Sequence, residues 1–167
     1  YLGVHLAQML KAVGLRVQGW SRTEKNLDGI NSFSGRAGLD HMLSNTNYLA
    51  CLLPNTPATE GIMDLSVFNK MPRGSYVLNA GRGSQLVEPD LLEALNNGQI
   101  KGAALDVFKT EPLPKDHPFW TDQRILLTPH HAAEVFLPAA AKIFLKNIYS
   151  IRNNQPLIGL VNQELGY

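Results

Sequence analysis

The sequence is poor in cysteine and has no long apolar run. Its single cysteine, Cys51, excludes an internal disulfide. One cysteine suits a reducing compartment, so we expect a cytoplasmic protein. Cys51 lies inside a strand-like apolar segment, which predicts a buried side chain and not a nucleophile. The apolar runs are far shorter than the roughly 20 residues of a membrane helix, so no membrane partner is expected.

Neither sign of charge dominates the chain. Lys and Arg together number 15, and Asp and Glu number 14. There is no run rich in Lys or Arg, and this absence argues against a nucleic acid partner. No metal site is predicted. The 167 residues are enough for one domain with a sizeable core.

Strand-like and helix-like segments alternate along the chain. Strands are predicted over 15–20, 48–53, 75–79, 101–107 and 124–128. Helices are predicted over 3–13, 39–43, 64–71, 88–97 and from near Pro138 onward. This alternation predicts an α/β fold with a Rossmann-like, doubly wound parallel sheet that has helices on both faces.

The sequence also lacks the usual start of such a fold. A dinucleotide-binding unit begins with a strand and a G-x-G-x-x-G loop, whereas this chain opens at Tyr1-Leu2-Gly3 directly into a helix, without an initiator Met. If Gly3 is the third glycine, the central first strand is missing, and two buried strand edges would have no ladder partner. We therefore expect the chain to be the C-terminal part of a longer protein.

Three residues that can carry chemistry follow three of the predicted strands. Arg82 follows 76–79, Glu111 follows 103–107 and His130 follows 125–128. Ligands of open α/β sheets bind beyond the carboxyl ends of the strands. A guanidinium, a carboxylate and an imidazole at one edge could grip a carboxylate and move a proton.

Three motifs resemble the D-isomer-specific 2-hydroxyacid dehydrogenases. They are Leu78-Asn-Ala-Gly-Arg-Gly83, residues 102–114, and Leu127-Thr-Pro-His130. Residues 20–23, 53–57 and the terminal Gly166-Tyr167 are similar to the bacterial glyoxylate/hydroxypyruvate reductases within that family. The resemblance implies a dinucleotide-binding domain over 1–132. It also implies that 133–167 form a C-terminal helix and tail that return to a substrate domain.

The resemblance also implies roles for the three residues. Arg82 would bind the carboxylate and carbonyl of a 2-oxo acid, and His130 would protonate the oxygen as hydride arrives from the nicotinamide. Glu111 would hydrogen-bond the imidazole and raise its pKa. Taken without the family pattern, Arg82 could be a surface residue in a turn. His131 is the rival to His130, and we interpret it as a packing residue or as one that supports the site without touching the substrate.

The predicted cofactor is NADP in preference to NAD, because Arg22 and not an acid follows the second strand. Four residues are predicted at the cofactor from their places at a helix start and a strand end: Leu2, Gly3, Ser21 and Arg22. The resemblance adds six more: Leu53, Pro54, Thr59, Ala80, Gly81 and Asp106. Asp106 would contact the nicotinamide carboxamide, and its alternative is a buried structural cap. Pro54 and Ala80 could equally be loop packing.

The implied activity is reduction of glyoxylate or hydroxypyruvate by NADPH, in a homodimer. Two alternatives stay open. A protein of this fold can be a dinucleotide-sensing regulator, and a chain that lacks the substrate domain can be inactive by itself.

Overall fold

The structure is a computed structural model that describes residues 2–133 and 136–162. Its elements, in chain order, are α1 (Leu2–Ala12), β1 (Gln18–Trp20), β2 (Asn31–Phe33), α2 (Gly35–Leu43), β3 (Tyr48–Cys51), α3 (Leu65–Phe68), β4 (Ser75–Asn79), η1 (Gly83–Gln85), α4 (Glu88–Asn96), β5 (Ile100–Leu105), η2 (Pro118–Trp120), β6 (Ile125–Leu127) and α5 (Leu137–Arg152). The predicted α/β class with parallel strands is confirmed.

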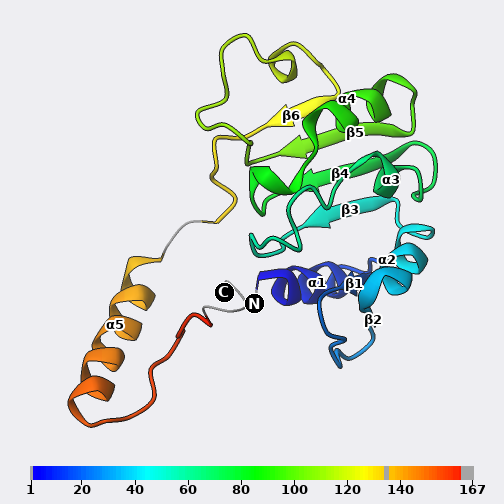
Figure 1. The fold of residues 1–167 in the computed structure, drawn as a ribbon. Coiled ribbons are helices and arrows are strands. Elements are labelled where there is room, and N and C mark those ends of the chain that lie inside the picture. Colours follow the sequence, from blue (N-terminus) through cyan, green and yellow to red (C-terminus); the bar gives the residue numbers. More distant parts are fainter. Residues whose placement is uncertain (1, 134–135, 163–167) are drawn as a thin grey trace.

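The strands form two parallel sheets. One has the order β1-β2 and the other the order β3-β4-β5-β6. In the larger sheet Tyr76 of β4 pairs with Tyr48 of β3 on one side and Gly102 of β5 on the other. Within the described residues no ladder joins β1 to β3. Figure 1 shows β1 and β2 below the edge of the larger sheet.

The core lies between the larger sheet and the helices α3 and α4. Phe68 of α3, Leu91 of α4 and Ile100 of β5 are all fully buried there. Residues alternate along a strand between the two faces of a sheet, so β4 buries Val77 on this side and leaves Leu78 38% exposed on the other. The second face of this sheet is thus open around Leu78, where helices were expected on both faces.

Several predicted boundaries were wrong. The sequence prediction missed β2 and both short 3-10 turns, and it started α2 four residues late. Strand β1 is shorter than predicted, and β5 ends at Leu105 instead of residue 107. Asp106 therefore lies just after the strand, where its backbone can turn toward β6. Short elements are decided by contacts with neighbouring segments, which periodicity does not report.

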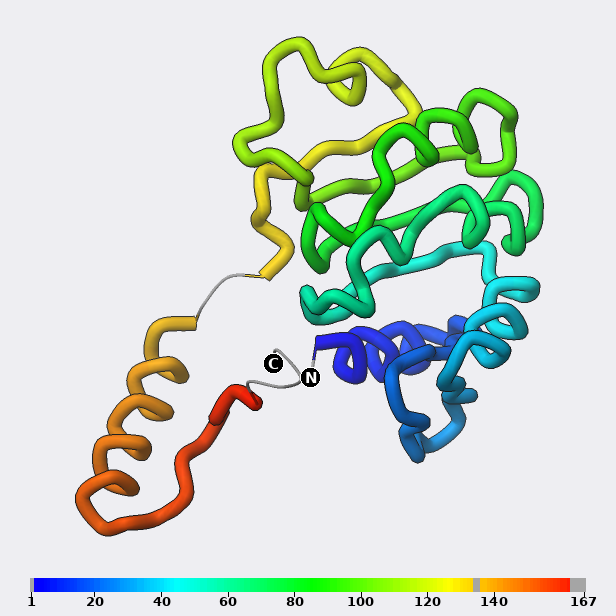
Figure 2. The backbone as a smooth tube through the Cα atoms, in the orientation of Figure 1, coloured from blue at the N-terminus to red at the C-terminus, as the bar shows by residue number. Residues whose placement is uncertain are grey.

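Helix α5 begins near Pro138 as predicted, and Pro fits the first turn because its missing N–H has no helical partner there. Figures 1 and 2 show α5 standing apart from both sheets. Its apolar side chains Ile143, Phe144 and Ile151 are exposed. No helix among the described residues is long and apolar enough to cross a membrane. The terminal Gly166 and Tyr167 lie outside the described residues, and a domain boundary at 132/133 stays a prediction.

Candidate active site

The carboxyl ends of β4, β5 and β6 meet at one edge of the larger sheet, because these strands are parallel neighbours. The loops that leave this edge carry Arg82, Glu111 and His130, one after each strand. Figure 1 shows the three loops beside one another. The sheet therefore brings together three residues that are spread over 48 positions of the sequence, from Arg82 to His130.

Glu111 and His130 are in direct contact. Nδ1 of His130 lies 2.8 Å from Oε2 of Glu111, and the other carboxylate oxygen accepts a 3.0 Å hydrogen bond from the backbone N–H of Phe108. The bond to His130 lowers the pKa of Glu111, and the Phe108 N–H and the positive charge of Arg82 lower it further. Glu111 is thus held as an anion against the imidazole, with Arg82 close enough to act on its charge.

His130 has a backbone that few residues other than glycine adopt. Its φ is 53°, in the left-handed region. Its N–H donates to the carbonyl oxygens of Asp106, at 2.8 Å, and Thr128, at 3.1 Å. These bonds hold the turn that directs the imidazole toward Glu111.

Asp106 is 6% exposed, and both oxygens of its carboxylate accept hydrogen bonds from within the protein. One oxygen accepts the Thr128 hydroxyl at 2.5 Å and the His131 N–H at 2.8 Å. The other accepts the N–H of Ala132 at 2.8 Å. Burial opposes ionisation, yet these hydrogen bonds lower the pKa of Asp106 below its ordinary value. The contacts match the buried structural cap, and contact with a nicotinamide stays a prediction.

Arg82 lies between two tightly packed glycines. Its side chain is exposed, and Nη1 donates to the Gly81 carbonyl at 2.7 Å. A Cβ on Gly83 would overlap the backbone of Phe108 and Lys109, which follow β5. The loop after β4 is therefore pressed against the loop that carries Glu111, and only a glycine allows that approach.

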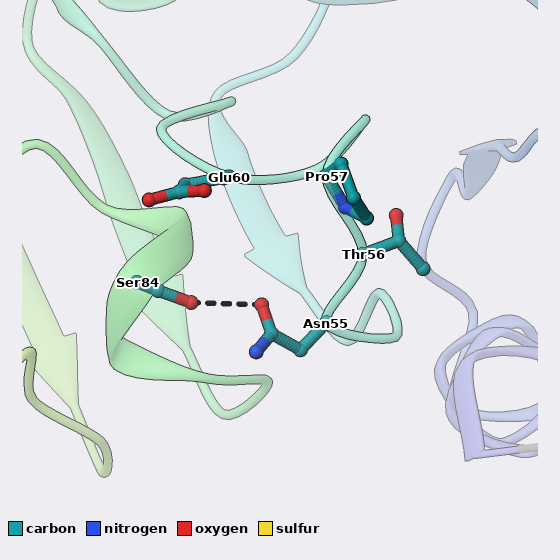
Figure 3. A pocket seen from close by; sticks show the side chains of 5 residues that line it. All are labelled: Asn55, Thr56, Pro57, Glu60 and Ser84. Atoms are coloured by element: carbon teal, nitrogen blue, oxygen red, sulfur yellow. Dashed lines mark hydrogen bonds between the residues drawn. The ribbon is translucent and has the colours of Figure 1, made fainter. Parts of the chain in front are cut away.

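A shallow cavity of about 280 Å³ lies next to this edge. Figure 3 shows its lining, which comes from the loop after β3 and from Ser84 of η1: Asn55, Thr56, Pro57, Glu60 and Ser84. The Ser84 hydroxyl donates to Oδ1 of Asn55 at 2.8 Å and joins the two loops. Both loops carry residues predicted to bind the cofactor.

The residues predicted at the cofactor ribose follow β1. The Ser21 hydroxyl donates to the carbonyl of Thr23 at 2.8 Å, and Arg22 is exposed. A guanidinium is a strong donor set for a phosphate dianion, and contact of Arg22 or Ser21 with the 2′-phosphate of NADP stays a prediction. Leu2 opens the 11-residue helix α1, and Gly3 has open space around it. A helix N-terminus of this kind suits a pyrophosphate.

The other predicted cofactor residues lie in the loops after β3 and β4. Thr59 is buried. Its hydroxyl accepts the Thr56 N–H at 2.9 Å and donates to the Pro54 carbonyl at 2.7 Å, so both bonds stay within its own loop. Pro54 is exposed, whereas Gly81 is buried. Thr59 therefore shapes the loop, and direct cofactor contact by Leu53, Pro54, Thr59, Ala80 or Gly81 stays a prediction.

Sequence reasoning missed the buried polar side chains beneath the site. Gln85 is fully buried, and Asn79 donates from Nδ2 to the Arg82 carbonyl at 3.1 Å. No periodicity marks such residues, although Asn79 and Gln85 flank Arg82 in sequence. Cys51 is buried as predicted, and burial raises the pKa of its thiol.

Comparisons with known proteins identify the family of the chain. Residues 1–132 match the model of the D-isomer specific 2-hydroxyacid dehydrogenase NAD binding domain. Glyoxylate/hydroxypyruvate reductase A of Serratia proteamaculans is 45% identical over 166 residues, which cover 99% of this chain and 53% of that protein. The chain spans about half the length of the curated relatives that it matches.

Solved structures give the same result. A D-isomer specific 2-hydroxyacid dehydrogenase from Xanthobacter autotrophicus, in complex with NADPH, superposes with a TM-score of 0.96 at 37% identity, over 99% of this chain and 69% of that one. An NADPH-dependent glyoxylate/hydroxypyruvate reductase from Sinorhizobium meliloti, in complex with NADP, has a TM-score of 0.94 at 38% identity, over 99% of this chain and 54% of that one. The chain belongs to the D-isomer-specific 2-hydroxyacid dehydrogenase family.

Proposed function

We propose that the full-length natural protein reduces a small 2-oxo acid, glyoxylate or hydroxypyruvate, to the 2-hydroxy acid with NADPH. The observation that carries this proposal is the 2.8 Å contact between Nδ1 of His130 and Glu111, beside Arg82. Relatives named as glyoxylate/hydroxypyruvate reductases support the choice of substrate. Since this chain spans about half of those relatives, the activity belongs to the full-length protein.

Arg82, Glu111 and His130 have different proposed roles, which follow from the chemistry of their side chains. The planar fork of Arg82 can bind a carboxylate oxygen and the neighbouring carbonyl oxygen together, and so align the carbonyl carbon. Glu111 occupies Nδ1 of His130, which leaves Nε2 as the nitrogen that donates a proton to the carbonyl oxygen. Bound NADPH supplies the hydride.

NADPH is proposed over NADH because of the residues after β1. Arg22 supplies donors and positive charge where an NAD-specific site would have an acid. Two solved relatives contain NADPH or NADP. A homodimer and a cytoplasmic location are also proposed, and light scattering and fractionation test them.

The direct test follows NADPH absorbance in purified full-length protein. We expect oxidation that depends on glyoxylate or hydroxypyruvate and is slower with NADH. A protein that binds NADPH tightly but never oxidises it with any small 2-oxo acid would instead be a dinucleotide-binding regulator.

Replacement of His130 tests the proton donor. We expect His130→Ala to lose about 10²–10⁴-fold in turnover, the usual contribution of a general acid, and to bind NADPH as before. His131→Ala is the matched control and should keep turnover within tenfold, because the backbone N–H of residue 131, which Asp106 accepts, survives the change. The reverse result would transfer the role to His131.

A further inference from the structure

Gln85 is a neutral polar side chain with no exposed surface, in the short turn η1 directly after Arg82. Its amide is fully bonded. Nε2 donates to the carbonyl oxygens of Leu53, at 2.9 Å, and Pro54, at 3.0 Å. Oε1 accepts the backbone N–H of Arg82 at 2.9 Å and the thiol of Cys51 at 3.3 Å. Every donor and acceptor of the group has a protein partner.

These bonds join two loops of the candidate site. Leu53 and Pro54 lie in the loop after β3, where a cofactor contact is proposed. Arg82 lies in the loop after β4 and is the proposed grip on the substrate. The chain also passes closely over the amide, because a Cβ on Gly81 would overlap Oε1 of Gln85. A primary amide carries donors and an acceptor in one plane, so a single side chain can fix both loops.

We infer that Gln85 is a positioning residue for the reaction. It holds the backbone of Arg82 at a set distance from the carbonyls of Leu53 and Pro54. The residue proposed to bind the oxo acid and the loop proposed to bind the cofactor therefore keep a fixed relative position. This role rests on the proposed function, since it acts through Arg82. An apolar side chain of similar size could fill the same space, but it would leave the Arg82 N–H and the Leu53 carbonyl without partners, while the Pro54 carbonyl would keep only the Thr59 hydroxyl.

Gln99 offers a matched control. Its Nε2 also donates to two backbone carbonyls, those of Phe68, at 2.8 Å, and Met71, at 2.9 Å. Gln99 precedes β5, at the amino end of the strand and therefore opposite the candidate site. Gln99→Leu removes the same kind of bond without touching Arg82.

The experiment compares Gln85→Leu, Gln85→Glu and Gln99→Leu in the full-length protein. Gln85→Leu should raise the KM for glyoxylate at least tenfold, whereas Gln99→Leu should keep that KM within twofold. Gln85→Glu retains an acceptor for the Arg82 N–H but loses the amide donors. It should weaken NADPH binding at least fivefold and raise the glyoxylate KM less than Gln85→Leu does.

Hydrogen exchange of the Arg82 amide gives a readout that needs no turnover. We expect protection in the wild type, in Gln99→Leu and in Gln85→Glu, and its loss in Gln85→Leu. The inference is overturned if Gln85→Leu leaves both this amide and the KM unchanged. If Gln85→Leu does not fold, unchanged NADPH affinity in Gln85→Glu overturns it. A wild type without any reductase activity would refute the proposed function, and Arg82 exchange would then decide the role of Gln85 alone.

Discussion

Asp106 supports the turn on which His130 is placed. Its carboxylate binds the N–H groups of His131 and Ala132 and the Thr128 hydroxyl, while its carbonyl accepts the N–H of His130. A left-handed conformation at a residue with a side chain persists only where its surroundings hold it. The geometry of His130, the proposed proton donor, therefore depends on a neighbour that has no need to contact the substrate.

Removal of the Thr128 hydroxyl tests this support. Thr128→Val should cost about 1.5 kcal/mol of unfolding free energy, the lower end for a hydrogen bond to a charged group, and Thr128→Ser should restore most of it. Urea unfolding measures both. Thr121 is the control, since its hydroxyl makes one exposed bond to the Pro118 carbonyl. Equal losses in Thr128→Val and Thr121→Val would contradict the role of Asp106.

The contact of Glu111 with His130 predicts a pH dependence. Because the pKa of folded Glu111 lies below the unfolded value of about 4.3, its contribution to stability is complete above that value. It is lost as the pH falls through the folded pKa. NMR titration of the Glu111 carboxyl carbon should show the lowered pKa, and His130→Ala should raise it. A Glu111 pKa that does not respond to this substitution would argue against the contact.

At the scale of elements, the site is made by loops that pack against each other. The loop from β4 into η1 touches the loop after β5 at Gly83, where no side chain fits beside Phe108 and Lys109. Two neighbouring strands deliver these loops in register, since Asn79 and Leu105 are paired at the strand ends. The approach of Arg82 to Glu111 follows from this packing.

Gly83→Ala should therefore be costly. The added Cβ would overlap backbone atoms, and forced overpacking of this kind costs about 1–3 kcal/mol. Gly19→Ala in β1 is the control, because a Cβ there meets nothing within 4 Å. Thermal unfolding of the two variants measures the difference. Similar melting temperatures for both would show that the two loops can separate without loss.

At the scale of the whole molecule, the strands differ in the number of neighbouring strands with which they pair. Strands β4 and β5 have a partner on each side, whereas β1 and β2 pair only with each other in the described part of the chain. Hydrogen exchange of this 167-residue chain should be slowest in β4 and β5 and much faster in β1 and β2. Uniform protection of all six strands would contradict the division into two sheets.

Much of this architecture was predictable. The segments 75–79, 88–97 and from near Pro138 onward, which form β4, α4 and α5, were predicted from their apolar patterns and from prolines at helix starts. These signals are clear because each segment keeps one regular pattern along its length. The three-residue strand β2 was missed, since Asn31–Phe33 is defined by its pairing with β1. The residues Arg82, Glu111 and His130 were chosen from their places after strands, and their catalytic roles stay predictions.

The sequence by itself determined the family, the parallel α/β pattern and the candidate residues, because motifs and periodicity are local properties of the chain. The family resemblance already implied that Glu111 contacts His130, and the structure shows this contact. Tertiary structure alone decided that Asp106 is used as a buried cap and that Gln85 joins two loops. Those facts depend on strand order and on which loops meet. A hydrogen bond between residues such as Gln85 and Leu53, 32 positions apart, exists only when the fold brings them together.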